Sequence, residues 1–278
     1  MKKEFKLLCM TLSAATLLTS CLSEEHEFGK PSIKEEGKGT LVLNLNANAE
    51  FNNETRALTE ANYRNTNNYD VRIYNTKNDN LVLECKGSEL SDNLPKTLDI
   101  ASYRIEASYG TESAASRNDF KMFGQSTFTI KADEQKSVTV NCSPTCGKIA
   151  VAFDAQMSVY YKDYNVSFGG TKALGSNTIS WAKMDSDPYY VALSEDGETI
   201  SYTISLTAKE EYLHQDGSNT ASTGTAKGTF QLQRNKAHKL TIKPNYIPTT
   251  DGGMKLTITI DESTNDENIT YEIPVTWL

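Results

Sequence analysis

The sequence predicts an all-β protein made of two tandem β-sandwich domains, which follow an export signal and a flexible tether. Three observations predict this architecture. Apolar and polar residues alternate with a period of two along many short segments, helical periodicity is almost absent, and four strand-like segments recur in the same order. Such alternation is typical of strands that bury one face, and several such strands between turn residues are typical of a sandwich.

The strand-like segments come in two copies, with an offset close to 100 residues between them. Chance would rarely preserve four strand types in the same order. We therefore predict two copies of one β-domain, spanning residues 39–143 and 144–278. The matched segments are 39–47 with 147–155, 69–75 with 164–170, 101–109 with 200–208, and 126–140 with 228–242.

The alternation also predicts which side chains form the two cores, because a strand with one buried face points every second side chain inward. By contrast, His238 lies in a polar hairpin region beside two lysines and is predicted at the surface. The predicted first core contains Ile105, Phe128, Ile130, Val138 and Val140, and the second contains Ile149, Val151, Phe153, Ile204, Phe230 and Ile242.

The second copy is followed by a segment that has no counterpart in the first. Residues 254–260 alternate, residues 261–268 are polar and acidic, and residues 269–277 alternate again. The acidic run lacks the ligand spacing and the central glycine of a calcium-binding EF-hand loop. The segment therefore predicts an extra C-terminal hairpin with a solvated loop.

The first 20 residues have the features of a secretory signal. A basic start precedes an apolar stretch that is shorter than the ~20 residues of a membrane-spanning helix. The run L-T-S-C that ends at Cys21 resembles the lipobox of bacterial lipoproteins. We expect cleavage before Cys21, acylation of its thiol, and a polar tether over residues 21–38, because acyl chains hold a protein on a membrane.

Charge and motifs predict a protein without catalytic residues. The net charge of −8 and the absence of a Lys/Arg cluster do not suit nucleic-acid binding. The sequence contains no nucleophile elbow, no H-E-x-x-H motif, no phosphate-binding loop and no dinucleotide fingerprint. We therefore predict no enzyme, no cofactor and no nucleic-acid partner.

Three cysteines remain after removal of the signal and acylation of Cys21, namely Cys85, Cys142 and Cys146. A zinc site needs about four ligands, and the three histidines lie far from the pair Cys142 and Cys146 in sequence. We predict structural thiols and no metal site. A disulfide remains open, because pairing cannot be deduced from sequence.

Two features have both a structural and a functional interpretation. Arg56 follows the first strand in a stretch without strand signal, so it is either a plain surface arginine or accessible to a trypsin-like protease. Tyr189 and Tyr190, in the run D-P-Y-Y, either pack within a strand or offer a stacking platform for a glycan. From the residues alone, the structural interpretation is favoured at both places.

Taken together in order, these motifs resemble a known group of proteins. The lipobox cysteine, the acidic tether, the strand G-T-L-V-L-N-L-N, the run T-R-A-L and the two β-domains resemble the fimbrillin-like lipoproteins of Bacteroides-type bacteria, in particular the family of domain of unknown function 4493. The resemblance implies transthyretin-like sandwiches and a lipid-anchored, surface-exposed protein of the outer membrane. It also implies that Ser23, Glu24 and Glu25 form an export signal behind Cys21.

The resemblance further implies assembly by strand exchange. A protease would cut between Arg56 and Ala57, and release of the strand 39–46 would open a groove for a neighbouring subunit's strand, which is β-augmentation. The candidate donor strand has Ile269, Tyr271, Ile273, Val275 and Trp277 on one face. Pro274 removes one backbone donor from it, and the plainer interpretation of this segment is the last strand of its own domain.

The sequence thus predicts a non-catalytic cell-surface lipoprotein that acts as a fimbrial or adhesin-like component. Its expected partners are the membrane, reached through the lipid anchor, other fimbrial subunits in a homo- or hetero-polymer, and a host or glycan ligand. The alternative function is a glycan-binding surface lipoprotein that uses Tyr189 and Tyr190.

Overall fold

The computed structural model describes residues 37–49, 51, 60–209, 223–245, 255–262 and 266–272, and for the last two ranges it describes the backbone alone. The described residues belong to one compact unit. Several predicted features lie outside them: the signal 1–20, Cys21, Ser23, Glu24, Glu25, Arg56, Ala57, Ile273, Val275 and Trp277.

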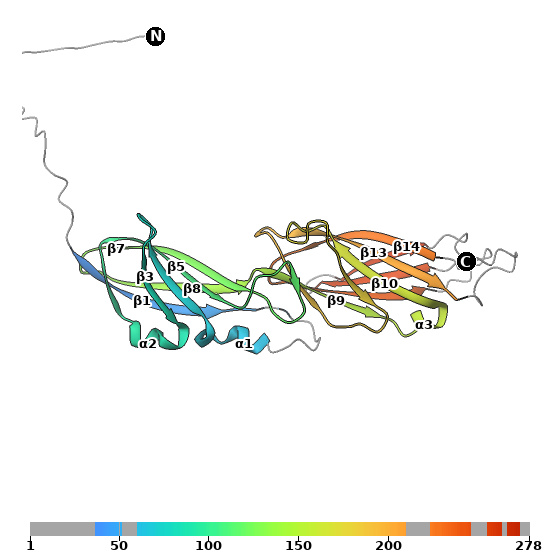
Figure 1. Cartoon of the computed structure of the whole chain (residues 1–278), viewed down its shortest axis with the longest axis horizontal. Helices are drawn as coiled ribbons and strands as arrows, with labels where there is room; N and C mark the ends of the chain where they lie inside the picture. Colours follow the sequence, from blue (N-terminus) through green and yellow to red (C-terminus); the bar gives the residue numbers. More distant parts are fainter. Residues whose placement is uncertain are drawn as a thin grey trace, which may run out of the picture. The chain divides into compact units, whose positions relative to one another are not determined.

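The first copy forms the N-terminal sandwich, whose strands β1, β3, β5, β7 and β8 are labelled in Figure 1 and whose hydrogen-bonded order includes seven strands. Its strands are β1 (Lys38–Ala47), β2 (Asp70–Asn75), β3 (Leu81–Lys86), β4 (Lys96–Asp99), β5 (Ala101–Tyr109), β7 (Met122–Ile130) and β8 (Gln135–Pro144). Its short helical turns are α1 (Glu60–Arg64), η1 (Thr66–Asn68), η2 (Gly87–Glu89) and α2 (Leu90–Asn93).

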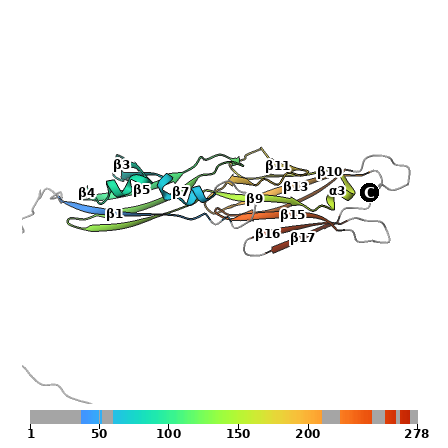
Figure 2. The same ribbon diagram turned by 90° about the horizontal axis from the view of Figure 1, so that it is seen from below.

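The second copy forms the C-terminal sandwich, whose two layers are visible in Figure 2 with β10, β11 and β13 in one and β9, β15, β16 and β17 in the other. Its elements are β9 (Cys146–Phe153), α3 (Met157–Tyr160), β10 (Tyr161–Gly169), β11 (Ile179–Ala182), β12 (Tyr189–Ala192), β13 (Glu198–Ala208), β14 (Thr223–Leu232), β15 (Ala237–Asn245), β16 (Lys255–Glu262) and β17 (Asp266–Glu272).

The two sandwiches repeat the same strand order. In the first, β3-β2-β5-β7 continues into β8-β1-β4, with β7 and β8 matched at only two residue pairs. In the second, β11-β10-β13-β14 is one sheet, and β15-β9-β12 repeats the order β8-β1-β4 in the other. The pairs β1–β8 and β9–β15 are both parallel. The predicted duplication and the predicted all-β sandwich fold are therefore confirmed.

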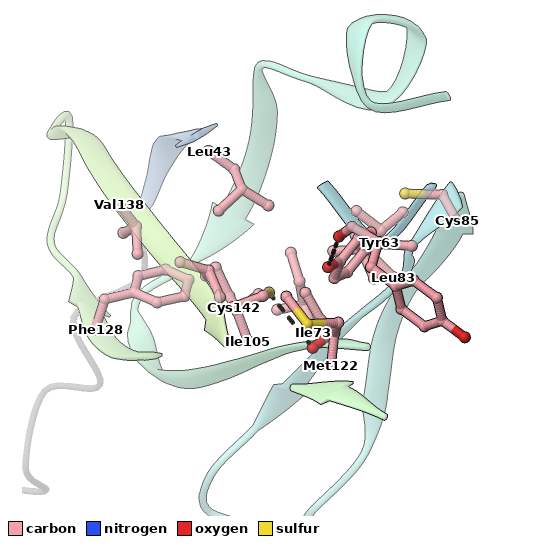
Figure 3. Packing of buried hydrophobic residues seen from close by; sticks show 14 of the residues in the cluster. Leu43, Tyr63, Ile73, Leu83, Cys85, Ile105, Met122, Phe128, Val138 and Cys142 are labelled. Carbon is pink, nitrogen blue, oxygen red and sulfur yellow. Dashed lines mark hydrogen bonds between the residues drawn. The ribbon is translucent and has the colours of Figure 1, made fainter. Parts of the chain in front are cut away.

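The cores contain the side chains that the alternation predicts. Side chains from both layers of the N-terminal sandwich pack together, as Figure 3 shows for Leu43, Ile105, Phe128 and Val138. All five residues predicted for this core are buried in it. In the second core all six predicted residues take part, although Phe153 is only partly buried.

The loop between β5 and β7 crosses from the first sandwich to the second. Within it the short strand β6 (Ala115–Ser116) pairs with β12 and extends the sheet of the C-terminal sandwich. The loop begins at Gly110, whose φ of +80° suits glycine, and a Cβ there would lie 2.0 Å from the carbonyl oxygen of Phe120. The predicted domain boundary at residues 143–144 falls at the end of β8 and stays a prediction.

Two local predictions are corrected by the structure. The predicted loop 261–268 is shorter, because β16 continues to Glu262 and β17 begins at Asp266; a backbone ladder can continue through polar residues. His238, predicted at the surface, is buried and stacks on Phe230 with ring centroids 5.3 Å apart, and this burial lowers its pKa to about 4. It has the same parity along β15 as the buried Leu240 and Ile242.

Candidate functional site

The candidate site has two parts. One is the position of β1 in its sheet, and the other is the region where the chain after β1 meets the C-terminal sandwich, which we call the junction. Strand β1 lies between two others, parallel to β8 and antiparallel to β4. Its side chains Leu41 and Leu43 are buried in the core. Gly39 lies so close to the β7–β8 turn that a Cβ would come within 2.6 Å of the carbonyl oxygen of Lys131.

The chain remains anchored for several residues after β1 ends. The backbone N–H of Asn48 donates to the carbonyl oxygen of Cys142 at 2.9 Å, and the guanidinium of Arg64 donates to the carbonyl oxygen of Ala49 at 2.9 Å. Phe51 is buried, and its ring lies 5.4 Å from that of Phe120. If the chain is cut after Arg56, the segment that leaves with β1 therefore includes Phe51, a buried aromatic residue that lies beyond the hydrogen-bonded ladder of β1.

A buried ion pair joins α1 to the C-terminal sandwich. The ammonium of Lys148, on β9, lies 3.0 Å from Oε1 of Glu60, and the two side chains are only 1% and 14% exposed. The same carboxylate oxygen accepts a hydrogen bond of 2.9 Å from the hydroxyl of Tyr190 on β12. Since buried charges need partners, these three side chains depend on one another.

A second ion pair joins the β5–β7 loop to the same sandwich. The guanidinium of Arg117 donates to both carboxylate oxygens of Asp185, at 2.7 and 2.6 Å. This hydrogen bonding is the largest cause that lowers the pKa of Asp185. The guanidinium also lies over the ring of Tyr189, 4.2 Å from its centroid, which is within the range of a cation–π contact.

Both tyrosines that were predicted as a glycan platform take part in these contacts. Tyr189 and Tyr190 are neighbours on β12, so their side chains point to opposite faces. Tyr190 is only 3% exposed, and burial, followed by the neighbouring Glu60, raises its pKa. Tyr189 is half-buried with Arg117 across its ring. The idea of a shared glycan platform is therefore corrected, because one ring is buried and the other is covered.

In the sequence, the predicted processing site falls between two residues that the structure describes as anchored. Arg56 and Ala57 are outside the described residues, but Phe51 on one side and Glu60 on the other are both held at the same junction. Of the predicted donor residues, Ile269 and Tyr271 lie on β17, opposite Ile258 and Leu256 of β16. Strand β17 is the last strand of its sheet among the described residues.

A separate cleft of about 550 Å³ lies in the C-terminal sandwich. Phe153 and Tyr164 line it with ring centroids 4.9 Å apart, and the ammonium of Lys183 lies 5.7 Å from the centroid of Tyr164. Met184, 90% exposed, also lines it. Ser158, Ser186, Asp154 and Asp185 also line it, and both carboxylate oxygens of Asp185 accept hydrogen bonds from Arg117.

The three cysteines that were predicted to be structural thiols lie in the interior. Cys85, Cys142 and Cys146 are free and buried, and burial raises the pKa of each thiol, that of Cys142 to about 12. Within the described part of the chain no group of three or more metal-ligating side chains comes together. None of the helices described there is long and apolar enough to cross a bilayer.

Sequence reasoning missed the junction residues Phe51, Glu60, Arg117 and Lys148. One signal was present: β9 reads C-G-K-I-A-V-A-F, and its outward positions hold a cysteine, two alanines and a single lysine where a solvated strand would carry several polar residues. Residues on both faces of β9 are buried up to Val151. The partner of Lys148 lies 88 residues away, so nothing local could identify it.

Comparisons with known proteins give a family and distant structural relatives. The model of a domain of unknown function, DUF4493, matches residues 37–275. No curated protein matches the chain. Among solved structures, a fimbrial assembly protein from Parabacteroides distasonis is similar at 11% identity and a TM-score of 0.41, over 85% of this chain and 99% of that one.

Two proteins from Porphyromonas gingivalis are similar to a comparable degree. The tip fimbrial protein Mfa3 has 9% identity and a TM-score of 0.41, over 81% of this chain and 99% of that one. The fimbrial anchor protein Mfa2 has 10% identity and a TM-score of 0.38, over 81% of this chain and 97% of that one.

Proposed function

The chain belongs to the DUF4493 family, and from this premise we propose that it is a non-catalytic cell-surface lipoprotein that assembles as a fimbrial or adhesin-like subunit. In this proposal the lipid on Cys21 carries the precursor to the outer membrane, with Ser23, Glu24 and Glu25 as its export signal. A cut between Arg56 and Ala57 then releases β1, and a strand of a neighbouring subunit takes its place.

The observation that carries the proposal is the position of β1 in both sequence and sheet. It lies between β8 and β4, where it satisfies the edges of both strands and buries Leu41 and Leu43. It also precedes every other described strand. A single cut behind β1 therefore separates it from the rest of the fold without breaking any other connection.

The second sandwich provides an internal comparison. Its β9 has the same neighbours in the same directions, parallel to β15 and antiparallel to β12. However, β9 lies in the middle of the chain, between β8 and β10. A single cut cannot free β9. Of the two sandwiches, only the first therefore has a strand in this position that one cut can release.

Loss of β1 would leave the edges of β8 and β4 unpaired, and an incoming strand must pair with both. Strand β8 would lose its ladder from Gln135 to Cys142, and β4 would lose its ladder over Lys96–Asp99. Unpaired edge groups of this kind are a template for another strand. The incoming strand needs apolar side chains at alternate positions, and Ile269, Tyr271, Ile273, Val275 and Trp277 have that spacing.

Treating the purified chain with an arginine-specific protease tests this function. We expect the new N-terminus to be Ala57 and the product to form SDS-resistant ladders, because β-augmentation with buried side chains exchanges slowly. Arg56→Ala should abolish both results. Arg72→Ala, which removes an arginine that is 46% exposed on β2, is the matched control and should leave the cut at Ala57 unchanged. Chains that keep Cys21 at their N-terminus and stay monomeric would contradict the proposal.

A glycan-binding surface lipoprotein is the second candidate, and the cleft beside Phe153 is the observation that favours it. Its volume is within the range of small-molecule sites. Its lining combines the half-buried ring of Phe153 with serine and aspartate residues, and a sugar's apolar face and hydroxyls require such a mixture. This site replaces Tyr189 and Tyr190 in the glycan hypothesis.

Retention on immobilised polysaccharides measures this second function. If the cleft binds a glycan, Phe153→Ala should weaken retention at least about 10-fold, as expected for loss of a central aromatic contact. Val159→Ala, at an exposed position on the neighbouring α3 outside the cleft, should leave retention unchanged. Equal retention of both variants, or none by the unaltered protein, would remove this candidate.

A further inference from the structure

The cleft beside Phe153 lies along a part of β9 whose ladder is complete on one side only. On that side β9 pairs with β15, and on the other side β12 covers it only as far as the pair Ile149–Tyr189. Among the described residues, no strand pairs with β9 beyond Ile149 on the β12 side. The next residues of β9, 151–153, line the cleft. The cleft therefore borders a free strand edge.

The backbone groups of Val151 and Phe153 are directed to this free edge. The N–H groups of Lys148 and Asp154 both donate to carbonyl oxygens on the β15 side, at 2.9 Å. Successive residues of a strand direct their N–H and C=O groups to alternate sides. Since Lys148 and Asp154 have even numbers, the odd-numbered Val151 and Phe153 direct their N–H and C=O groups to the side of the cleft.

Two hydrogen bonds keep β12 from covering the free edge. In a continued ladder the residue opposite Val151 would be Asp187. The carbonyl oxygen of Asp187 accepts a hydrogen bond from the indole N–H of Trp181 at 2.7 Å, and its N–H donates to Oδ1 of Asp185 at 3.3 Å. Both backbone groups of Asp187 are therefore used elsewhere, and those of Val151 are left for another partner.

The first sandwich covers the corresponding side of β1. There residues 48–69 connect β1 to β2 and include α1 and η1, which both lie close to β1. The guanidinium of Arg64 donates to the carbonyl oxygen of Ala49 on this side. In the second sandwich only residues 154–160 connect β9 to β10. The two copies share their strand positions, and the shorter connection leaves the edge of β9 open.

Another part of the cleft's lining is the loop between β11 and β12, which holds an exposed apolar side chain. Met184 is 90% exposed and has a φ of +69°, a left-handed conformation that residues other than glycine rarely adopt. The next residue fixes the loop, because the N–H of Asp185 donates to the carbonyl oxygen of Ala182 at 3.0 Å and its carboxylate binds Arg117. Backbone strain of this kind clusters at ligand sites.

The carboxylates in the lining already have partners within the protein. Asp185 binds the guanidinium of Arg117 through both oxygens. Oδ1 of Asp154 accepts a hydrogen bond of 2.8 Å from the backbone N–H of Gln156. A ligand in the cleft therefore meets the backbone amide groups of the free edge as its main directional polar partners.

We propose that the cleft binds an N-acetylated sugar, with the acetamido group on the free edge of β9. This inference rests on the glycan candidate proposed above and names the class of sugar. An acetamido group has the donor and the acceptor of a peptide unit, so it can satisfy a backbone group of Val151 or Phe153 as a strand would. Its methyl group and the apolar face of the sugar contact the ring of Phe153 and the side chain of Met184.

The length of the free edge favours a single amide over a peptide strand. The chain turns away after Phe153, because the N–H of Met157 donates to the carbonyl oxygen of Asp154 at 2.9 Å where α3 begins. Only Val151 and Phe153 therefore offer groups to a ligand along β9. A β-strand pairs over several successive residues, whereas an acetamido group needs one position.

Titration of the purified full chain with matched sugars tests the inference. Chitotriose and cellotriose differ only in an acetamido group in place of a hydroxyl on each ring, and N-acetylgalactosamine and galactose form a second such pair. By isothermal titration calorimetry, at least one acetylated sugar should bind at least about 5-fold more tightly than its partner, as one additional hydrogen bond predicts. In NMR spectra the N–H signals of Val151 and Phe153 should shift more than those of Ala150 and Ala152.

A variant at the cleft and a matched variant elsewhere show where the sugar binds. Met184→Gly keeps the backbone conformation, because glycine accepts a positive φ, and should weaken binding at least about 4-fold, the contribution of one buried methylene group. Asp133→Gly is the control: Asp133 has a φ of +56° in the turn between β7 and β8, outside the cleft. It should leave binding unchanged.

The other outcomes overturn the inference and are distinct from failure of the glycan candidate. Equal binding of acetylated and plain sugars would mean that the cleft does not recognise the acetamido group. If neither sugar binds although polysaccharides are retained, the inference fails and the glycan candidate stands; if retention is absent as well, both fail. Tighter binding of an extended peptide of alternating valine and threonine would assign the free edge to strand addition instead.

Discussion

Replacing Lys148 by methionine is expected to lower the free energy of unfolding by about 3–5 kcal/mol, the usual cost of breaking a buried ion pair. Methionine matches the lysine stem in size, so the loss comes from the charge. Glu60 would keep the hydroxyl of Tyr190 but lose its cation in a site where its side chain is only 14% exposed. Urea unfolding of the intact chain at neutral pH, followed by circular dichroism, measures the change.

Two variants show that the effect belongs to the pair. Adding Glu60→Gln to Lys148→Met should restore most of the loss, because no uncompensated charge then remains buried. Lys38→Met breaks the ion pair with Asp99, whose partners are 69% and 79% exposed, and should cost less than about 1 kcal/mol. A double variant no more stable than Lys148→Met alone would contradict this account.

The fold could be predicted because its main signal is local. Alternation within single strands predicted the inward positions, such as Ile105 and Ile149, and these are buried as expected. Comparison of segments such as 39–47 and 147–155 predicted the duplication, which the matching positions of β1 and β9 confirm. Each of these inferences needs only residues within one strand or a comparison of two strands.

The junction could not be predicted, because its contacts connect residues far apart in the chain. Tyr190 and Glu60 are separated by 130 residues, and Arg117 and Asp185 by 68. A tyrosine in a strand next to a proline indicates either packing or a platform, and only the covering groups distinguish the two. His238 was placed wrongly because its charged neighbours outweighed its parity.

The candidate site also has one part that could be predicted from the sequence and one part that could not. The N-terminal position of β1 and its apolar face were evident from sequence, and the resemblance supplied the cut at Arg56. The aromatic site that receives Phe51 became visible only when Phe120, Lys148 and Tyr190 came together from three separate segments. Strand exchange is therefore a prediction from the sequence and the resemblance, whereas the surroundings of Phe51 are seen only in the structure.

Replacing Trp181 by alanine is expected to destabilise the C-terminal sandwich by about 3–5 kcal/mol, the usual cost of removing a buried large aromatic side chain. Trp181 lies on β11 and packs edge-on against Phe168 and Tyr189, with centroids 5.1 and 5.0 Å away. Its indole N–H donates to the carbonyl oxygen of Asp187 at 2.7 Å. Far-UV circular dichroism during denaturant unfolding measures the loss without relying on the removed fluorophore.

The loss should reach the junction, because Tyr189 contacts Trp181 as well as the guanidinium of Arg117. A double-mutant cycle between Trp181→Ala and Arg117→Ala should therefore give a coupling energy of at least about 0.5 kcal/mol. Trp181→Phe is the matched control: it keeps most of the packing and leaves the Asp187 carbonyl without its donor, at about 1–3 kcal/mol. Strictly additive effects would mean that Arg117 binds Asp185 independently of the aromatic stack, and that the second ion pair holds the junction by charge alone.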